Sequence, residues 1–157
     1  MGTDLHPYVV FLPSEKKNKT LSAIFGSKAA VEILRYSLKL GISSKLYQKE
    51  LVDKLTFSNK TIIENLKSLT KLGVLTESME KTTHNGRVVW VKTYQLSDLG
   101  KWFALLLAEE KELSKEETAE ILQNLFRSYV RWVVDLTQKV GIDKKLLIDI
   151  FDQEIER

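Results

Sequence analysis

Hydrophobic positions recur at helical spacing along much of the chain and divide it into short segments separated by turn residues. Ser27 can cap a helix that runs to about Leu40, and Gly41 can end it. Two further amphipathic segments fill residues 46–75, with a break in the helical spacing at 56–58. The pattern therefore predicts three helices, the last two of which form a helix-turn-helix.

The helix predicted from Ser58 to Leu72 is the most informative of the three. Ser58 can cap its start, and Gly73 can take the left-handed backbone that ends many helices. Its apolar side consists of Ile62, Leu66, Leu69 and Leu72. The opposite side and the first turns then carry Asn59, Lys60, Thr61, Ile63, Glu64, Lys67 and Lys71. A helix that leaves such a face in water has the form of a DNA recognition helix in the major groove.

Individual side chains on this face suit base edges and phosphates. Lys60 and Lys67 can reach phosphates or guanine, and Ile63 can meet a thymine methyl group. Asn59 and Asn65 carry the donor and acceptor pair that matches adenine. Glu64 has two interpretations: it accepts a hydrogen bond from cytosine, or it pairs with Lys60 and Lys67 on neighbouring turns, which we favour.

A β-hairpin is predicted after this helix, because the residues from Thr76 onward are typical of strands and Asn85-Gly86 suits a tight turn. Trp90, Tyr94 and Leu96 alternate onto one face and are predicted to be core. The tip carries no carboxylate and presents Lys81, Thr82, Thr83, His84, Asn85 and Arg87. It can lie over phosphates or place Arg87 in a narrow minor groove; the alternative is a solvated hairpin whose polar residues prevent edge pairing.

Residues 27–107 resemble the winged helix-turn-helix transcription regulators, in the broad group of the MarR, ArsR and PadR families. The resemblance rests on Glu50-Leu51, the helix from Ser58 to Leu69, Leu72-Gly73-Val74-Leu75 and the closing Tyr94-Gln95-Leu96-Ser97-Asp98-Leu99-Gly100. It implies a mainly α fold with a small β-hairpin (α+β), additional C-terminal dimerisation helices, and binding of double-stranded DNA as a homodimer. It departs from the family at Thr56, where such turns usually carry glycine.

The resemblance also implies a phosphate contact at Tyr47 and Gln48. In the family the helix that begins there commonly lies against a phosphate, where free backbone amides favour an anion. A core aromatic residue is the alternative interpretation of Tyr47.

The C-terminal part begins with a helix after the hairpin, whose apolar stripe contains Leu99, Trp102, Phe103, Leu106 and Leu107. Ser114 and Glu117 then form a capping box for a helix from about Lys115 to Val140. This long helix is apolar almost all round, so it needs cover on more than one side. The predicted cover is the same helix of a second subunit, through Leu122, Phe126, Tyr129, Trp132, Val133, Leu136 and Val140.

An effector pocket lined by Phe126, Tyr129 and Trp132 is the alternative use of these aromatic residues. After Gly141 a last helix, capped by Asp143, is predicted. Its apolar face is expected to be buried and consists of Leu146, Leu147, Ile150, Phe151 and Ile155.

Composition agrees with a nucleic-acid-binding half and a partner-binding half. Through Gly100 the chain has 15 Lys and Arg against 9 Asp and Glu, whereas the remainder has 9 against 12, which together give the net charge of +3. We expect an N-terminal arm (1–26), a winged DNA-binding domain (27–110) and a helical dimerisation region (111–157). The arm combines an apolar run between two prolines with a basic stretch that could meet phosphates.

Other classes of protein are disfavoured. The chain of 157 residues has no cysteine and only two histidines, His6 and His84, in segments of different character. We find no phosphate-cradling loop, catalytic triad or credible metal cluster, so neither an enzyme nor a cofactor or metal is expected. With no membrane span or signal sequence, we expect a cytoplasmic protein. The remaining alternative is a winged-helix protein-interaction module in a transcription, replication or sorting assembly.

Overall fold

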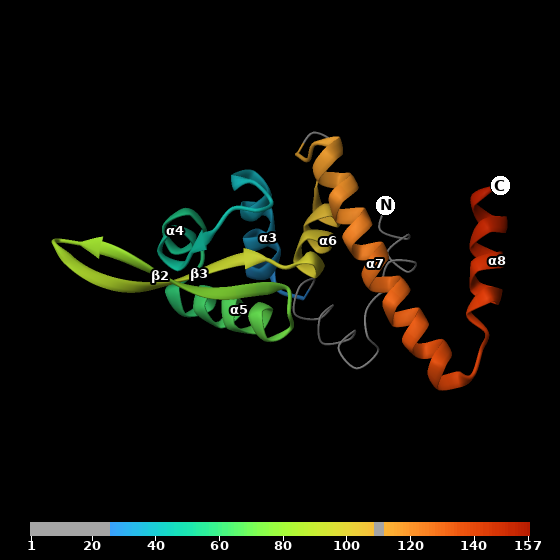
Figure 1. The fold of residues 1–157 in the computed structure, drawn as a ribbon. Helices are drawn as coiled ribbons and strands as arrows, with labels where there is room; N and C mark the ends of the chain where they lie inside the picture. The colour runs from blue at the N-terminus through green and yellow to red at the C-terminus, as the bar shows by residue number, and fades with distance from the viewer. Residues whose placement is uncertain (1–25, 109–111) are drawn as a thin grey trace.

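The computed structural model describes residues 26–108 and 112–157, so nearly all of the predicted N-terminal arm, with its basic stretch and His6, lies outside the described residues. A bundle of short helices carries a long β-hairpin, and two further helices lead away from it (Figure 1). In chain order the elements are α3 (Lys28–Leu40), β1 (Leu46–Tyr47), α4 (Gln48–Lys54), α5 (Asn59–Lys71), β2 (Leu75–His84), β3 (Arg87–Leu96), α6 (Asp98–Leu107), α7 (Lys115–Val140) and α8 (Lys144–Ile155). The architecture is a winged helix-turn-helix with additional C-terminal helices, as predicted.

The predicted helix caps are confirmed. Ser58 Oγ accepts from the backbone amide of Thr61, and Ser27 and Ser97 cap α3 and α6 in the same way. The capping box of Ser114 and Glu117 is complete at the start of α7, and Asp143 caps α8. Because these caps satisfy backbone amides that a helix leaves unpaired, the start of each element is specified by its local sequence.

The sheet has three antiparallel strands in the order β1-β3-β2. Asn85 and Gly86 both have positive φ, 50° and 75°, which confirms the predicted tight turn between β2 and β3. β1 is not predicted by the sequence pattern, which indicates a helix start at Tyr47. Instead Leu46 pairs with Tyr94 and Tyr47 with Thr93, and the helix begins one residue later.

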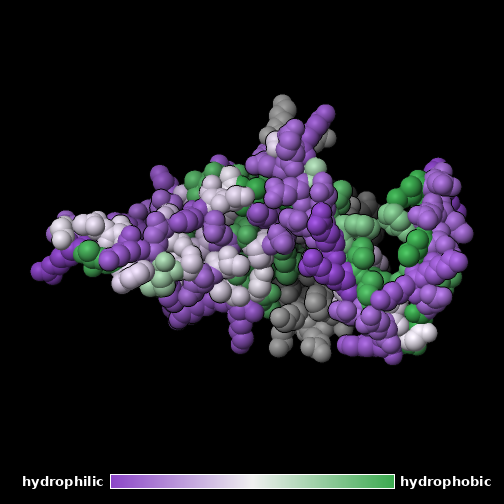
Figure 2. Space-filling view, viewed as in Figure 1, coloured by the Kyte–Doolittle hydropathy of each residue, from purple (hydrophilic) through white to green (hydrophobic). Residues whose placement is uncertain are grey.

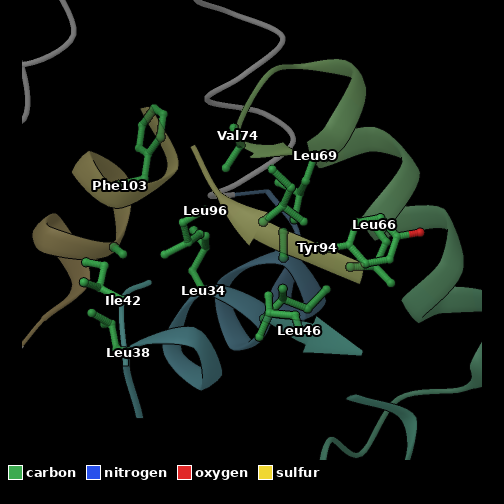
Figure 3. Close-up of a cluster of buried hydrophobic side chains, with 14 of the residues drawn as sticks. Leu34, Leu38, Ile42, Leu46, Leu66, Leu69, Val74, Tyr94, Leu96 and Phe103 are labelled. Carbon is green, nitrogen blue, oxygen red and sulfur yellow. The ribbon is translucent and has the colours of Figure 1, made fainter. Parts of the chain in front are cut away.

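The core lies where α3, α5 and α6 meet the base of the hairpin (Figure 3). Leu34 of α3, Leu46 of β1, and Leu66 and Leu69 of α5 are fully buried there, beside Tyr94 of β3. The predicted apolar side of α5 is therefore the side that packs. Its cationic side is left exposed.

Gly100 fixes the approach of α6 to the strand that follows α5. A Cβ atom at this position would lie 2.1 Å from the backbone oxygen of Val74, so no larger residue fits without a shift. Ser97 strengthens the same junction, since its hydroxyl donates to the carbonyls of Gly73 and Val74 and its amide donates to Val74. These bonds hold both ends of the hairpin on the helices.

Two burial predictions are wrong. Tyr94 and Leu96 are buried as expected, but Trp90 is 63% exposed because the hairpin continues past the helices that form the core. The predicted apolar face of α8 is not buried either: no residue of this helix, which the structure describes in full, is buried. Ile155, for example, is 66% exposed.

Helices α7 and α8 form what we call the helical arm. α7 packs on α6, and among its apolar residues Ile121 and Leu125 are buried. The inner sides of α7 and α8 face each other with hydrophobic residues, and the outer side of α8 is hydrophilic (Figure 2). The rings of Phe126 and Phe151 lie 5.7 Å apart, yet both are exposed. Within the described ranges, no helix is long and apolar enough to cross a membrane.

Candidate nucleic-acid interface

The exposed face of α5 carries the polar side chains that the sequence singled out. Asn59, Lys60, Glu64 and Lys67 are exposed, and Ile63 lies among them half-buried. The buried residues Ile62, Leu66 and Leu69 hold the opposite side of the helix on the core. The orientation of this face is thus determined by the packing of α5.

The starts of α4 and α5 are joined at this face. The Gln48 amide nitrogen donates to Asn59 Oδ1 over 3.4 Å, which links the first residues of the two helices. Ser58 and Thr61 have their hydroxyls 2.9 Å apart, so both are engaged in the helix cap. Of the predicted contact residues, Gln48, Ser58, Asn59 and Thr61 therefore lie together at one end of the helix-turn-helix.

Charge on α5 is only partly compensated. Lys60 Nζ lies 3.9 Å from Glu64 Oε1, so the pairing favoured for Glu64 is present with Lys60. Lys67 and Lys71 have no ion-pair partner among residues 26–108 and 112–157. The Lys60 pair is 84% and 65% exposed in its two side chains, and such a pair contributes little stability. Lys60 is therefore free to exchange Glu64 for another anion.

Asn65 is already occupied within the protein. Its Oδ1 accepts a hydrogen bond from Ser27 Oγ at 2.8 Å, and its Nδ2 donates to the backbone oxygen of Thr61 at 2.8 Å. These bonds tie α3 to α5. Asn59 is better suited to an adenine edge, because it is exposed and its Oδ1 accepts only the long bond of 3.4 Å from Gln48.

Tyr47 is half-buried, and its hydroxyl donates to Glu80 of β2 at 3.0 Å. Lys45 binds the same carboxylate at 3.2 Å. The bonds from Lys45 and then Tyr47 lower the pKa of Glu80 below its usual 4.5, and the bond to Glu80 raises the pKa of Tyr47 above 10.0. This cluster connects the start of α4 to the hairpin of β2 and β3, which we call the wing. Neither of the two interpretations of Tyr47 predicts this role.

The tip of the hairpin presents the predicted wing residues, all of them exposed: Lys81, Thr83, His84, Asn85 and Arg87. The hairpin projects well beyond α4 and α5 (Figure 1). Neither Lys81 nor Arg87 has an ion-pair partner in the described part of the chain. The candidate residues thus form two groups, one on α5 and one on the wing.

Some features of this region are not predicted by local sequence patterns. Lys45 and Glu80 are 35 residues apart in the sequence, and no local pattern predicts their pairing. The alternation predicts Trp90 to be core, but Trp90 is exposed, and so are Met79 and Val88 on the same face of the hairpin. Among the residues described, there is no group of three or more His, Asp or Glu side chains that could hold a metal ion.

Comparison with known proteins adds only a distant likeness. No family model matches the chain, and no curated protein matches it. One similar solved structure is described as a "Possible transcriptional regulator from Methanosarcina mazei Go1"; it is 17% identical, with 80% of this chain and 85% of that chain covered and a TM-score of 0.38. A likeness at this level carries no information on what this chain binds.

Proposed function

We propose that this protein is a sequence-specific, double-stranded DNA-binding transcription regulator that acts as a homodimer. In this proposal α5 enters the major groove, and the wing lies along the backbone or in the minor groove. The observation that carries it is a pair of cationic surfaces whose charge is not fully compensated, the exposed face of α5 and the wing tip, which both belong to the winged half (residues 27–110). Lys67, Lys81 and Arg87 have no anionic partner within the described residues, and phosphates can supply one.

The proposal assigns different roles to the two parts of the chain. Residues 27–110 bind DNA in this account, and residues 111–157 join two subunits. Exposed large apolar residues on both helices of the arm support the second role: Leu122, Phe126, Val130, Leu136, Val140, Leu146, Ile148, Ile150, Phe151 and Ile155. A monomer rarely leaves such a surface in water, and a two-fold pairing of helical arms would cover it.

A two-fold dimer constrains the DNA site. Two copies of α5 would meet successive major-groove faces, so the half-sites should be inverted repeats with centres about 10 base pairs apart or a multiple of that spacing. Within each half-site, Asn59, Lys60, Ile63 and Lys67 are the residues in reach of bases and phosphates. Gln48 and Tyr47 lie beside the adjacent backbone.

Charge reversal tests the proposal. The variant with Lys60→Glu, Lys67→Glu and Arg87→Glu should lose duplex binding in fluorescence anisotropy by about a thousandfold or more, because three favourable phosphate contacts per subunit become repulsive. The circular dichroism spectrum should not change, since all three side chains are exposed.

A matched control reverses the same number of charges elsewhere. Lys39, Lys139 and Lys144 are exposed on α3, α7 and α8, so replacing them with Glu changes the net charge equally. This variant should keep most of the affinity. Equal losses of duplex affinity in the two variants would show that only the net charge of the protein matters. Unchanged binding by the variant at Lys60, Lys67 and Arg87 would favour the protein-interaction alternative.

A further inference from the structure

An apolar strip on the wing is left exposed by the fold. In an antiparallel pair, directly opposite residues share a face and successive pairs alternate between faces. The register pairs Met79 with Lys92, Trp90 with Lys81 and Val88 with Thr83, and all three pairs lie on the face that continues from Tyr94 and Leu96. Met79, Trp90 and Val88 are 52%, 63% and 56% exposed, so the core-facing side of the sheet continues into water as an apolar strip.

The strip lies level with the start of α5. The helix has 13 residues and spans about 20 Å, and the connection at Gly73 returns the chain along the helix as β2. The six residue steps from Leu75 to Lys81 also cover about 20 Å. We therefore expect the pair of Lys81 and Trp90 near the first turn of α5, where the part of the sheet that the helices cover ends.

Two cations lie on the face of the strip, Lys81 and Lys92, and Glu77 is the acidic residue on that face. Residues 81–92 contain no aspartate or glutamate, and Arg87 lies on the opposite face at the hairpin tip. Each exposed apolar side chain stands opposite a cation or a hydroxyl in the register, although Lys92 also pairs with Glu77 at 3.4 Å. An apolar partner protein does not require this charge. A polyanion whose grooves offer apolar sugar and base surfaces requires both features.

We propose that Trp90, with Met79 and Val88 beside it, enters the minor groove of duplex DNA as an apolar wedge next to the segment contacted by α5. Apolar side chains in this position contact deoxyribose rings or part a base step, while flanking cations hold the phosphates on either side. Lys81 and Lys92 are the flanking cations here. This inference rests on the proposed DNA binding and assigns the role of the exposed wing face within it.

The decisive experiment measures duplex affinity over a range of salt concentrations for Trp90→Ala, Trp90→Phe and Val89→Ala. Trp90→Ala should weaken binding on the order of tenfold at every salt concentration, with the slope of log affinity against log salt unchanged, because indole carries no charge. Trp90→Phe should retain most of the affinity. Val89 lies on the opposite face of the same strand, so Val89→Ala should bind as the unaltered protein does.

Fluorescence adds an independent readout. Trp102 is buried and Trp132 lies half-buried on α7 of the helical arm, so a change in tryptophan emission that requires DNA and is lost in Trp90→Phe is assigned to Trp90. A circular dichroism spectrum of each variant confirms folding, which we expect because Trp90 lies outside the core.

Two results would overturn the inference while leaving DNA binding in place. One is an unchanged affinity of Trp90→Ala for duplexes whose binding still requires Lys60, Lys67 and Arg87. The other is dissociation of the protein into monomers by Trp90→Ala with each subunit's affinity retained, which would assign the strip to a second copy of the chain. If the unaltered protein binds no duplex at all, the proposed function fails and this inference fails with it.

Discussion

The winged half and the helical arm have similarly apolar sequences but bury them very differently. In the winged half, the predicted apolar sides of α3 and α5 are packed against each other and against the sheet, with Leu34, Leu46 and Leu66 fully buried. In the arm, α8 buries nothing and α7 leaves Leu122 and Leu136 exposed. Since burial of apolar surface is the main force that stabilises a fold, the winged half is complete in one chain and the arm is not.

Charge also differs along the chain. Through Gly100 the chain carries 15 basic and 9 acidic residues, a net charge of +6, whereas the remainder, which includes most of α6 as well as the arm, carries 9 and 12, a net charge of −3. The excess of positive charge thus lies in the part of the chain that holds the helix-turn-helix and the hairpin. The contrast predicts that changes in the arm alter association, whereas changes in the winged half alter stability or binding.

The largest effect should come from placing charge on the apolar side of the arm. Leu136→Asp with Phe151→Asp should convert dimers to monomers, because each carboxylate would be buried at the interface without a compensating charge. Duplex affinity should then fall by about a hundredfold, since a dimer gains avidity from two linked sites. Light scattering and anisotropy measure the two effects.

A control variant places two carboxylates at polar positions instead. Gln138→Asp with Lys145→Asp adds two carboxylates at exposed positions of the same helices and should leave the dimer intact. An unaltered protein that is monomeric at high concentration would contradict the account of the arm.

An intermediate effect is expected at the junction of α6 with β2. Gly100→Ala should lower the free energy of unfolding by about 1 to 3 kcal/mol, because its Cβ would meet a backbone oxygen that cannot move alone. Gly73→Ala has open space around it but a φ of +78°, so its cost should be about 1 kcal/mol. Urea unfolding measures both values. A smaller loss at Gly100 than at Gly73 would indicate a loosely packed winged half.

The smallest effect should be the contribution of Glu80, which links α4 to the wing. Lys45 and Tyr47 lower the pKa of this carboxylate, so the ionised form is favoured in the folded state. The associated stability is present at neutral pH and is lost as the pH falls through the folded-state pKa. Glu80→Gln should therefore melt slightly below the unaltered protein at neutral pH, and the difference should disappear once the pH has fallen below the folded-state pKa of Glu80. A difference that persisted in acid would point to packing instead of charge.

Local chemistry explains which features of the fold were predictable. Three helix starts are indicated by capping side chains that bond to groups within three residues: Ser58, Ser114 and Asp143. The turn at Asn85-Gly86 is specified by the backbone preference of these two residues alone. Such signals do not depend on the rest of the molecule. The helices and the hairpin could therefore be predicted with nearly the observed bounds.

Features that depend on distant partners were not predictable. The alternation of Trp90, Tyr94 and Leu96 correctly gives their common face, but it does not say where the helices beneath that face end. β1 has two residues, too few for any periodicity, and exists because β3 lies beside it. The apolar face of α8 predicts burial without saying whether the cover comes from the same chain.

The candidate site divides in the same way. Lys60, Lys67 and Arg87 could be placed on exposed surfaces because their apolar neighbours determine the orientation of each element. Two hydrogen bonds of the site join residues far apart in the sequence: Asn65 with Ser27, 38 positions apart, and Tyr47 with Glu80, 33 positions apart. The spacing of residues in the sequence predicts neither contact.

The proposed function requires that the winged half contact DNA phosphates and that the helical arm join two subunits. The most direct test titrates a labelled random-sequence duplex with protein at several salt concentrations, with the mass of the free protein determined by light scattering. If Lys60, Lys67, Lys81 and Arg87 of both subunits meet phosphates, log affinity should fall against log salt with a slope of about −7. A folded dimer that binds no duplex even at low salt would contradict the claim and direct the search to a protein partner.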